Sequence, residues 1–247
     1  MVVMSIAGVD PSAGAGIFAD LKVFQALNVY GTGVVTALTA QNPYHFFSIE
    51  PVNSDYIESQ IDSVLDSYPV EYIKTGMLYS KENMKAVGKK IQEYDFKTVV
   101  DPIMIATSGG ILSKDDSTKY LKKYVLKNAI FTTPNTYEAE KLTGLKISNE
   151  DSAIEASLKL GDLCNNIITG GHLKGINVIN IDGEITIKKQ DLIESNNLHG
   201  SGCNFSAGIV SFLERKNTLK ESVLKSLNYT FESVRNGNYG TLIAKNE

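Results

Sequence analysis

A glycine-rich segment near the carboxyl end could bind phosphate and move a proton. Gly200-Ser201-Gly202 lies directly before a strongly apolar stretch that is typical of a buried helix. Backbone amides converge at such a helix start and carry the positive end of the helix dipole, which suits phosphate or a developing negative charge. Cys203 falls in the first turn, where the same field should lower the pKa of its thiol and let it accept a proton from a bound alcohol. The alternative is that Cys203 is a small buried apolar residue.

Oxygen-bearing side chains elsewhere could bind a divalent cation. Asn135 and Glu138 are three residues apart at a predicted helix start, so both can face one region and hold Mg²⁺ or its waters. The same spacing fits a capping box, in which the two side chains only satisfy the first turn. Asp101, before Pro102, is an acid at a strand end and is either a metal partner or a brace for its loop.

The amino-terminal glycines match a dinucleotide-binding fingerprint only in part. Gly14, Gly16 and Ala19 spell G-x-G-x-x-A, but after Asp20 the next acidic residue is Glu50, so the ribose-binding carboxylate of that fingerprint has no counterpart. These glycines still permit close approach of a small ligand.

Two further side chains suit an aromatic ring. Gln41 offers donors and an acceptor for an aminopyrimidine or pyridine edge. Met77 can pack on such a ring or belong to the core.

Strands and helices alternate along the chain and must position these groups. Apolar runs predict strands near 2–7, 32–37, 70–75, 97–100, 129–132, 166–169 and 177–181. The stretches between them predict helices near 15–28, 54–67, 80–94, 113–127, 135–143, 150–163, 202–214 and 218–235, with Ser80, Ser113 and Ser201 as N-caps. Residues 176–188 predict a hairpin that turns at Asp182-Gly183. The alternation indicates an α/β fold with a mostly parallel sheet, whose ligands gather at the carboxyl ends of the strands.

Composition narrows the class of protein. The chain has 247 residues, a net charge of −4 and 24 basic residues, of which only Arg215 and Arg235 are arginines, so a nucleic-acid groove is not expected. No apolar stretch approaches a membrane span and no secretory signal is evident, which predicts a cytoplasmic protein without a membrane partner. The two cysteines and three histidines have no metal-binding spacing. The P-loop and protein-kinase motifs are also missing.

Seven motifs in order resemble one family. They are AGVDPSAGAGIFADLKVFQAL, GTGVVTALTAQN, KTGML, VVDPIMIATSGGIL, TPNTYEAEKLTG, GGHLKG and HGSGCNFSAGI. This order is similar to that of the hydroxymethylpyrimidine/phosphomethylpyrimidine kinases of thiamine biosynthesis, which are ribokinase-like enzymes. The resemblance spans nearly the whole chain and implies a single domain over 1–247 with a three-layer α/β/α sandwich. It also implies ATP- and Mg²⁺-dependent phosphorylation of a hydroxymethyl aminopyrimidine and then of its monophosphate, and a homodimer.

The resemblance assigns roles to particular residues. The pyrimidine pocket would be lined by Gly8, Ala15, Gln41, Met77 and Ile103. The anion hole would comprise Gly200, Ser201, Gly202 and the amide of Cys203, with Cys203 as the base. The metal and phosphate residues would be Asp101, Asn135 and Glu138, and the residues beside the nucleotide would be Thr169, Gly170, Gly171 and Asp182. A monovalent cation is a further candidate cofactor.

Departures from the family pattern keep other functions open. Thr169 stands where the family commonly has lysine, and Leu198 where it commonly has threonine. The missing lysine weakens the expectation for nucleotide affinity and for the second phosphorylation, although nearby Lys174 is a candidate substitute. A pyridoxine or pyridoxal kinase is the nearest alternative function. A non-catalytic pyrimidine-binding regulatory protein is the second.

Overall fold

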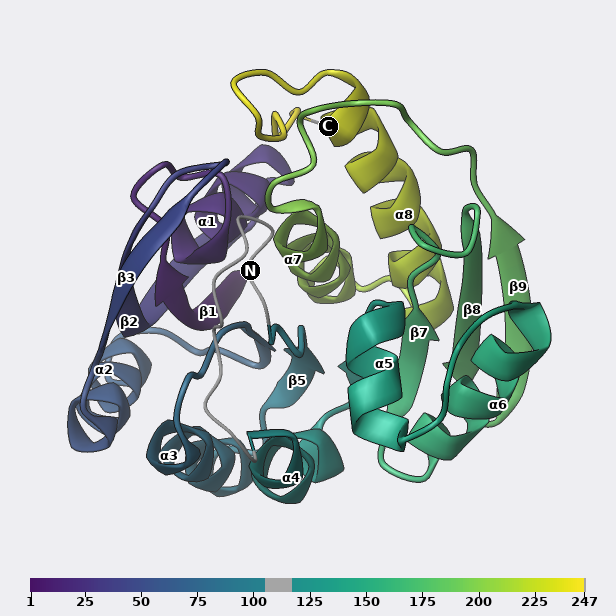
Figure 1. Ribbon diagram of the computed structural model, residues 1–247. Coiled ribbons are helices and arrows are strands. Elements are labelled where there is room, and N and C mark those ends of the chain that lie inside the picture. Colours follow the sequence, from purple (N-terminus) through teal and green to yellow (C-terminus); the bar gives the residue numbers. More distant parts are fainter. Residues whose placement is uncertain (105–116, 247) are drawn as a thin grey trace.

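A nine-stranded sheet forms the middle layer of the protein, in a computed structural model that describes residues 1–104 and 117–246 (Figure 1). The strand order is β3-β2-β1-β4-β5-β6-β7-β8-β9. Pairing is parallel from β2 through β7, whereas β3, β8 and β9 pair antiparallel with their neighbours. The strands are β1 Val2–Val9, β2 Tyr30–Gln41, β3 Phe46–Pro51, β4 Tyr72–Thr75, β5 Lys97–Val100, β6 Phe131–Thr132, β7 Asn165–Ile168, β8 Ile176–Ile181 and β9 Glu184–Lys189.

Helices cover both faces of this sheet. The α-helices are α1 Gly16–Ala26, α2 Ser54–Leu65, α3 Lys81–Glu93, α4 Ser117–Tyr120, α5 Thr136–Thr143, α6 Glu150–Gly161, α7 Ser201–Glu214 and α8 Leu219–Arg235. After α4 the chain continues through a π-helical turn, Leu121–Val125, and a 3₁₀ turn, Leu126–Asn128. Side chains of α1, α7 and α8 share one core cluster, and those of α2, α3, α5 and α6 share the other. The predicted α/β/α layering is therefore confirmed.

Alternation of side chains between the two faces of the sheet explains why the protein has two core clusters. In β1, Val3 belongs to the cluster under α1, α7 and α8, and the next residue, Met4, belongs to the opposite cluster. Successive side chains of a strand point to opposite faces, so a strand covered on both faces reads as a continuous apolar run. That is why the central strands could be predicted from sequence.

Three predictions about elements need correction. Strand β3 was not predicted, because as an edge strand it is mostly exposed and lacks a buried apolar run. Ser201 is not an N-cap: Gly200 occupies that position in a left-handed conformation, and Ser201 is the first helical residue. The helix predicted over 113–127 begins outside the described residues, as does its N-cap Ser113, and from 117 onward it is broken into three short turns. The Ser80 cap and the hairpin at Asp182-Gly183 are confirmed.

Candidate functional site

A cavity of about 590 Å³ opens at the carboxyl ends of the parallel strands. Its walls come from the ends of β1 and β2, from the segments that follow β1, β4, β5, β6, β7 and β9, from the start of α7 and from one side of α8. The predicted site residues that line it are Gly8, Ala15, Gln41, Met77, Asp101, Ile103, Asn135, Glu138, Thr169, Gly170, Gly171, Gly200, Ser201, Gly202 and Cys203. Residues from seven sequence motifs thus meet at one cavity, as expected for a parallel sheet.

The start of α7 forms one wall of the cavity. Gly200 has φ of +89°, and a Cβ built there would lie 1.8 Å from the carbonyl oxygen of Gly14, so no other residue fits without moving one of the two loops. Residues 200–203 therefore present the amino-terminal end of a 14-residue helix to the cavity. That end of a helix is suited to an anion.

The expected lowering of the Cys203 pKa is wrong. Cys203 is buried, and burial raises the pKa of its thiol to about 12, although the charge of Lys74 opposes the effect. Removal from water disfavours a thiolate more than the helix terminus favours it. In this structure Cys203 is therefore a neutral thiol at the edge of the cavity.

Two buried carboxyl groups, those of Asp101 and Glu138, line the cavity. Burial raises the pKa of Asp101 to about 6 and that of Glu138 to about 8, and the charge of Asp101 contributes to the second shift. Ser206 Oγ donates a hydrogen bond of 3.2 Å to Asp101 Oδ2. Two buried acids that repel each other suit a divalent cation, and Mg²⁺ is commonly held by one or two carboxylates together with phosphate oxygens and water. The donor set fits such an ion.

Glu138 and Asn135 also form the capping box that was the rival interpretation. The amide of Glu138 donates to Asn135 Oδ1 at 2.9 Å, and the amide of Asn135 donates to Glu138 Oε2 at 3.0 Å. Both residues nevertheless line the cavity. Capping therefore fixes the two side chains at the site, and the structural and functional interpretations are compatible.

A buried ion pair beneath the site was missed by sequence reasoning. Lys74 of β4 lies with its Nζ 2.8 Å from each carboxylate oxygen of Asp20 in α1, and both side chains are fully buried. Burial alone would lower the pKa of Lys74, but attraction to Asp20, and then to Cys203 and Asp101, raises it above its ordinary value. The only sequence signal was a lysine at the end of an otherwise apolar run, in KTGML.

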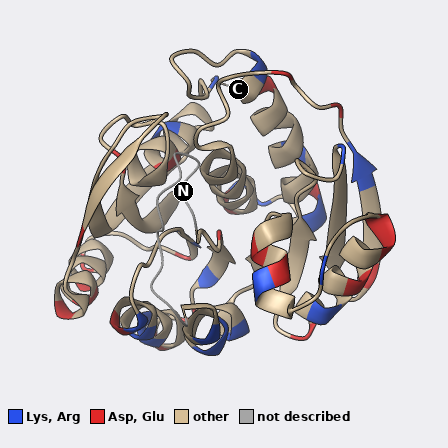
Figure 2. Cartoon of the chain, viewed as in Figure 1, with Lys and Arg blue, Asp and Glu red and all other residues tan. Residues whose placement is uncertain are grey.

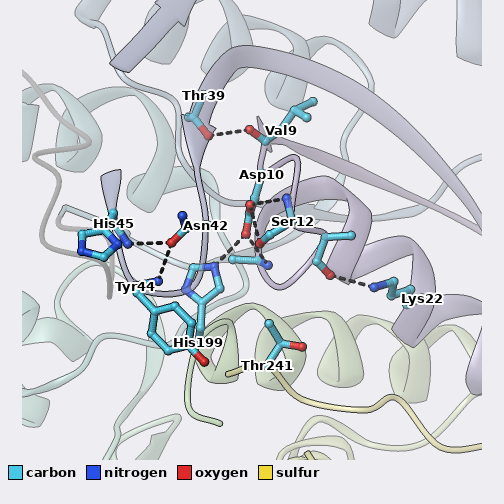
Figure 3. A network of polar contacts seen from close by, with 12 residues as sticks. Val9, Asp10, Ser12, Lys22, Thr39, Asn42, Tyr44, His45, His199 and Thr241 are labelled. Carbon is cyan, nitrogen blue, oxygen red and sulfur yellow. Dashed lines mark hydrogen bonds and ion pairs between the residues drawn. The ribbon is translucent and has the colours of Figure 1, made fainter. Parts of the chain in front are cut away.

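Asp10 and His199 form a second polar pair that sequence reasoning missed (Figure 3). His199 Nε2 lies 2.7 Å from Asp10 Oδ2, and both side chains are buried. The ring of His199 also lines the cavity. The sequence analysis considered the histidines only for metal-binding spacing, which does not point to a place for His199 at the cavity wall.

Met77 lines the cavity beside the end of β1. A Cβ at Gly8 would lie 2.1 Å from Met77 Cε, so glycine is what allows the methionine to lie over the end of β1. Met77 packs with buried Ala37 and with half-buried Ile103, Phe46 and Ile49. Both interpretations of Met77, core residue and ring contact, are thus compatible with its position.

Of the four residues expected beside the nucleotide, three lie at the cavity and one does not. Thr169, Gly170 and Gly171 follow β7 and line the cavity. The prediction for Asp182 is wrong: it lies at the tip of the β8–β9 hairpin, where its amide donates to Asn165 at the start of β7. Because β8 runs antiparallel to β7, that tip is at the edge of the sheet opposite the cavity. Lys174 is exposed and is not among the residues that line the cavity.

Both acidic and basic residues occur on the outer helices of the chain (Figure 2). Among the described residues, no helix is long and apolar enough to cross a membrane.

Comparison with known proteins finds one family over most of the chain. A family model described as phosphomethylpyrimidine kinase matches residues 10–243. A hydroxymethylpyrimidine/phosphomethylpyrimidine kinase of Bacillus subtilis is 36% identical, with 94% of this chain and 89% of the relative covered. The thiamine biosynthesis bifunctional protein ThiED of Geobacter sulfurreducens is 38% identical over 94% of this chain, and the chain spans 49% of its length.

Solved structures give the same fold. The phosphomethylpyrimidine kinase of Clostridium difficile superimposes with a TM-score of 0.84 at 35% identity, covering 95% of this chain and 99% of the other. The pyridoxal kinase of Staphylococcus aureus in complex with AMP-PCP and pyridoxal has a TM-score of 0.87 at 30% identity, covering 98% and 92%.

Proposed function

Because the chain belongs to the phosphomethylpyrimidine kinase family, we propose that it transfers phosphate from ATP to 4-amino-5-hydroxymethyl-2-methylpyrimidine and then to the resulting monophosphate. The protein is a phosphotransferase of thiamine biosynthesis. The observation that carries the proposal is the cavity itself, where a helix amino terminus, two buried carboxyl groups and the apolar side chains of Met77 and Ile103 meet.

Phosphoryl transfer requires positioning and charge stabilisation more than covalent chemistry. Gly8, Ala15, Gln41, Met77 and Ile103 would bind the pyrimidine, with the Gln41 amide at the polar edge of the ring. In the segment over residues 200–203, the Ser201 amide already donates to the carbonyl oxygen of Leu198 at 3.1 Å, so the amides of Gly202 and Cys203 would donate to the phosphoryl oxygens. Cys203 would orient the hydroxyl as a neutral thiol, and only its thiolate form could accept the hydroxyl proton. Thr169, Gly170 and Gly171 would lie along the nucleotide.

Asp101 and Glu138 would hold Mg²⁺, with Asn135 fixing the Glu138 side chain through the capping box. The ion, when bound, supplies positive charge that neutralises the phosphate oxygens. What the chain itself contributes is a buried acidic pair whose mutual repulsion a cation relieves. A monovalent cation remains a candidate second cofactor.

A product assay tests the function. The protein is incubated with ATP, Mg²⁺ and the hydroxymethylpyrimidine, and products are identified by mass spectrometry over time. We expect a monophosphate followed by a diphosphate. A monophosphate alone would assign the first step only and place the defect at Thr169, where the family commonly has lysine.

Pyridoxal kinase is the second candidate, and the likeness to the Staphylococcus enzyme with pyridoxal favours it. The same assay with pyridoxine or pyridoxal distinguishes the two, because a pyridoxine phosphate without any pyrimidine product would reassign the substrate. Binding of the pyrimidine without ATP consumption would instead favour a regulatory protein.

We also propose a homodimer and a cytoplasmic location. The dimer is supported by the apolar side chains of the edge of the sheet, where Leu38 of β2 is 53% exposed and Phe47 of β3 is 69% exposed. A long exposed edge strand is commonly covered by a partner. The location rests on the sequence alone.

A further inference from the structure

Asp10 and His199 join two loops that are 189 residues apart in the chain (Figure 3). Asp10 follows β1, and His199 directly precedes Gly200 at the start of α7. Asp10 Oδ2 and His199 Nε2 are 2.7 Å apart, and the two residues are 1% and 4% exposed. Because a carboxylate only accepts hydrogen bonds, Nε2 carries the proton. Among the described residues, His199 Nδ1 has no hydrogen-bond partner, so the contact with Asp10 is the one that orients the ring.

Asp10 also fixes the loop in which it lies. Its Oδ1 accepts hydrogen bonds from the amide and the hydroxyl of Ser12, at 2.9 and 2.8 Å. Its Oδ2 accepts from the amide of Ala15 at 2.9 Å, and Ala15 lines the cavity as the N-cap of α1. Burial alone would raise the pKa of Asp10, but the hydrogen bonds from His199 and Ser12 outweigh burial and lower it. The carboxylate therefore stays charged while it holds both loops.

A backbone contact lies beside this pair. A Cβ on Gly200 would lie 1.8 Å from the carbonyl oxygen of Gly14, and a Cβ on Gly14 would lie 2.6 Å from His199 Cδ2. The two loops thus touch without intervening side chains, and the imidazole covers Gly14. Any displacement of His199 must shift Gly200, and with it the amides of residues 201–203.

We propose that Asp10 and His199 are positioning residues for phosphoryl transfer. The pair locks the loop over residues 10–16 to the segment over residues 200–203, so the alcohol and the phosphoryl-binding amides are held at one separation. This inference rests on the proposed function. Neither side chain needs to touch the transferred group. A misplacement of about 1 Å can cost about 100-fold in rate, so the loss of such a lock is measurable in turnover.

Two variants of His199 test the role. His199→Leu removes the donor to Asp10, whereas His199→Gln keeps an amide N–H that can reach the carboxylate. We expect kcat for the pyrimidine to fall at least about tenfold in His199→Leu, with KM changed less than about threefold, and to recover most of its value in His199→Gln. Ser12→Ala is the matched control, because it removes one hydrogen bond to the same carboxylate without touching the segment over 200–203. Its kcat should fall by less than about threefold, well short of the loss in His199→Leu, because the bond between Asp10 and His199 remains.

The results separate a positioning role from a purely structural one. Thermal unfolding shows whether each variant is folded at the assay temperature. If His199→Leu is unfolded there, Asp10→Asn takes its place in the same measurements. A folded variant that keeps kcat within about twofold, or equal losses in His199→Leu and His199→Gln, would overturn the proposal. If the wild type phosphorylates no pyrimidine, the proposed function fails, and the affinity of the variants for AMP-PCP is measured instead. Weaker binding of AMP-PCP by His199→Leu than by His199→Gln would support the positioning role. Equal binding by the two variants would reject it.

Discussion

At the residue scale, the charge state of Cys203 determines how the site can work. A thiol with a pKa of about 12 keeps its proton at neutral pH. If the thiolate accepts the proton of the substrate hydroxyl, kcat should increase with pH between about 7 and 10. In this range, which lies below the pKa of the thiol, the thiolate fraction increases about tenfold for each unit by which the pH rises.

Cys203→Ala should lose this pH dependence and lower kcat by a factor of about 10²–10⁴. The measurement is the pH–rate profile of both proteins under saturating ATP and pyrimidine. Near-full turnover with the same profile in Cys203→Ala would rule out the thiol as the base and leave the anion-binding amides as the main contribution of this helix start.

The Lys74–Asp20 pair makes the second prediction at this scale. Removing one member of a fully buried pair leaves an uncompensated charge, so Lys74→Met should lower the free energy of unfolding by about 3–5 kcal/mol. Lys74→Met combined with Asp20→Leu should recover a large part of the loss, since no charge then remains unpaired. Urea unfolding measures both.

Lys89→Met is the control for that experiment, because the Lys89–Glu58 pair is on the surface, and its unfolding midpoint should stay unchanged. Equal stability of Lys74→Met and the double variant would show that the unpaired Asp20 charge adds no cost, and would contradict the prediction.

At the element scale, the start of α5 combines capping with a position at the site. Asn135→Ala should cost about 1 kcal/mol of stability, as the loss of an N-cap commonly does. Asn149→Ala removes the N-cap of α6, which forms the same type of capping box away from the cavity, and should cost a similar amount.

Only Asn135→Ala should reduce the affinity for ATP and Mg²⁺, because it releases the Glu138 side chain from its fixed position. Calorimetric unfolding and steady-state kinetics on the two variants give the comparison. Similar kinetics in both would mean that the box over 135–138 is a cap and nothing more.

Element prediction succeeded where one physical rule applied locally. The continuous apolar runs of β1 and β5 and the Ser80 cap could be read from neighbouring residues. Exposed β3 could not, because its place is decided by pairing with β2 and not by its own burial. Asp182 was assigned to the wrong edge of the sheet for a related reason: the turn was predicted, but its position depends on the direction of β8 against β7.

At the scale of the whole molecule, the residues that line the cavity were predictable because parallel strands bring their carboxyl ends together. The pairs Asp10–His199 and Lys74–Asp20 were not, since their members are 189 and 54 residues apart and share no local spacing. The pKa of Cys203 was misjudged for the same reason: its burial depends on the packing of α7 against the sheet, which sequence spacing does not show.

The proposed dimer extends this reasoning to the free edge of the sheet. If Leu38 and Phe47 are covered by a second copy, Phe47→Glu should place a charge in an apolar interface and weaken dimerisation by at least about tenfold in Kd, equivalent to about 1.4 kcal/mol. Sedimentation equilibrium over a range of protein concentrations measures this. Leu158→Glu on α6 is the control, because Leu158 is also exposed, at 48%, but lies far from β3 in the sheet order. A wild-type monomer at all concentrations would contradict the proposal, and equal weakening by both variants would move the interface away from β3.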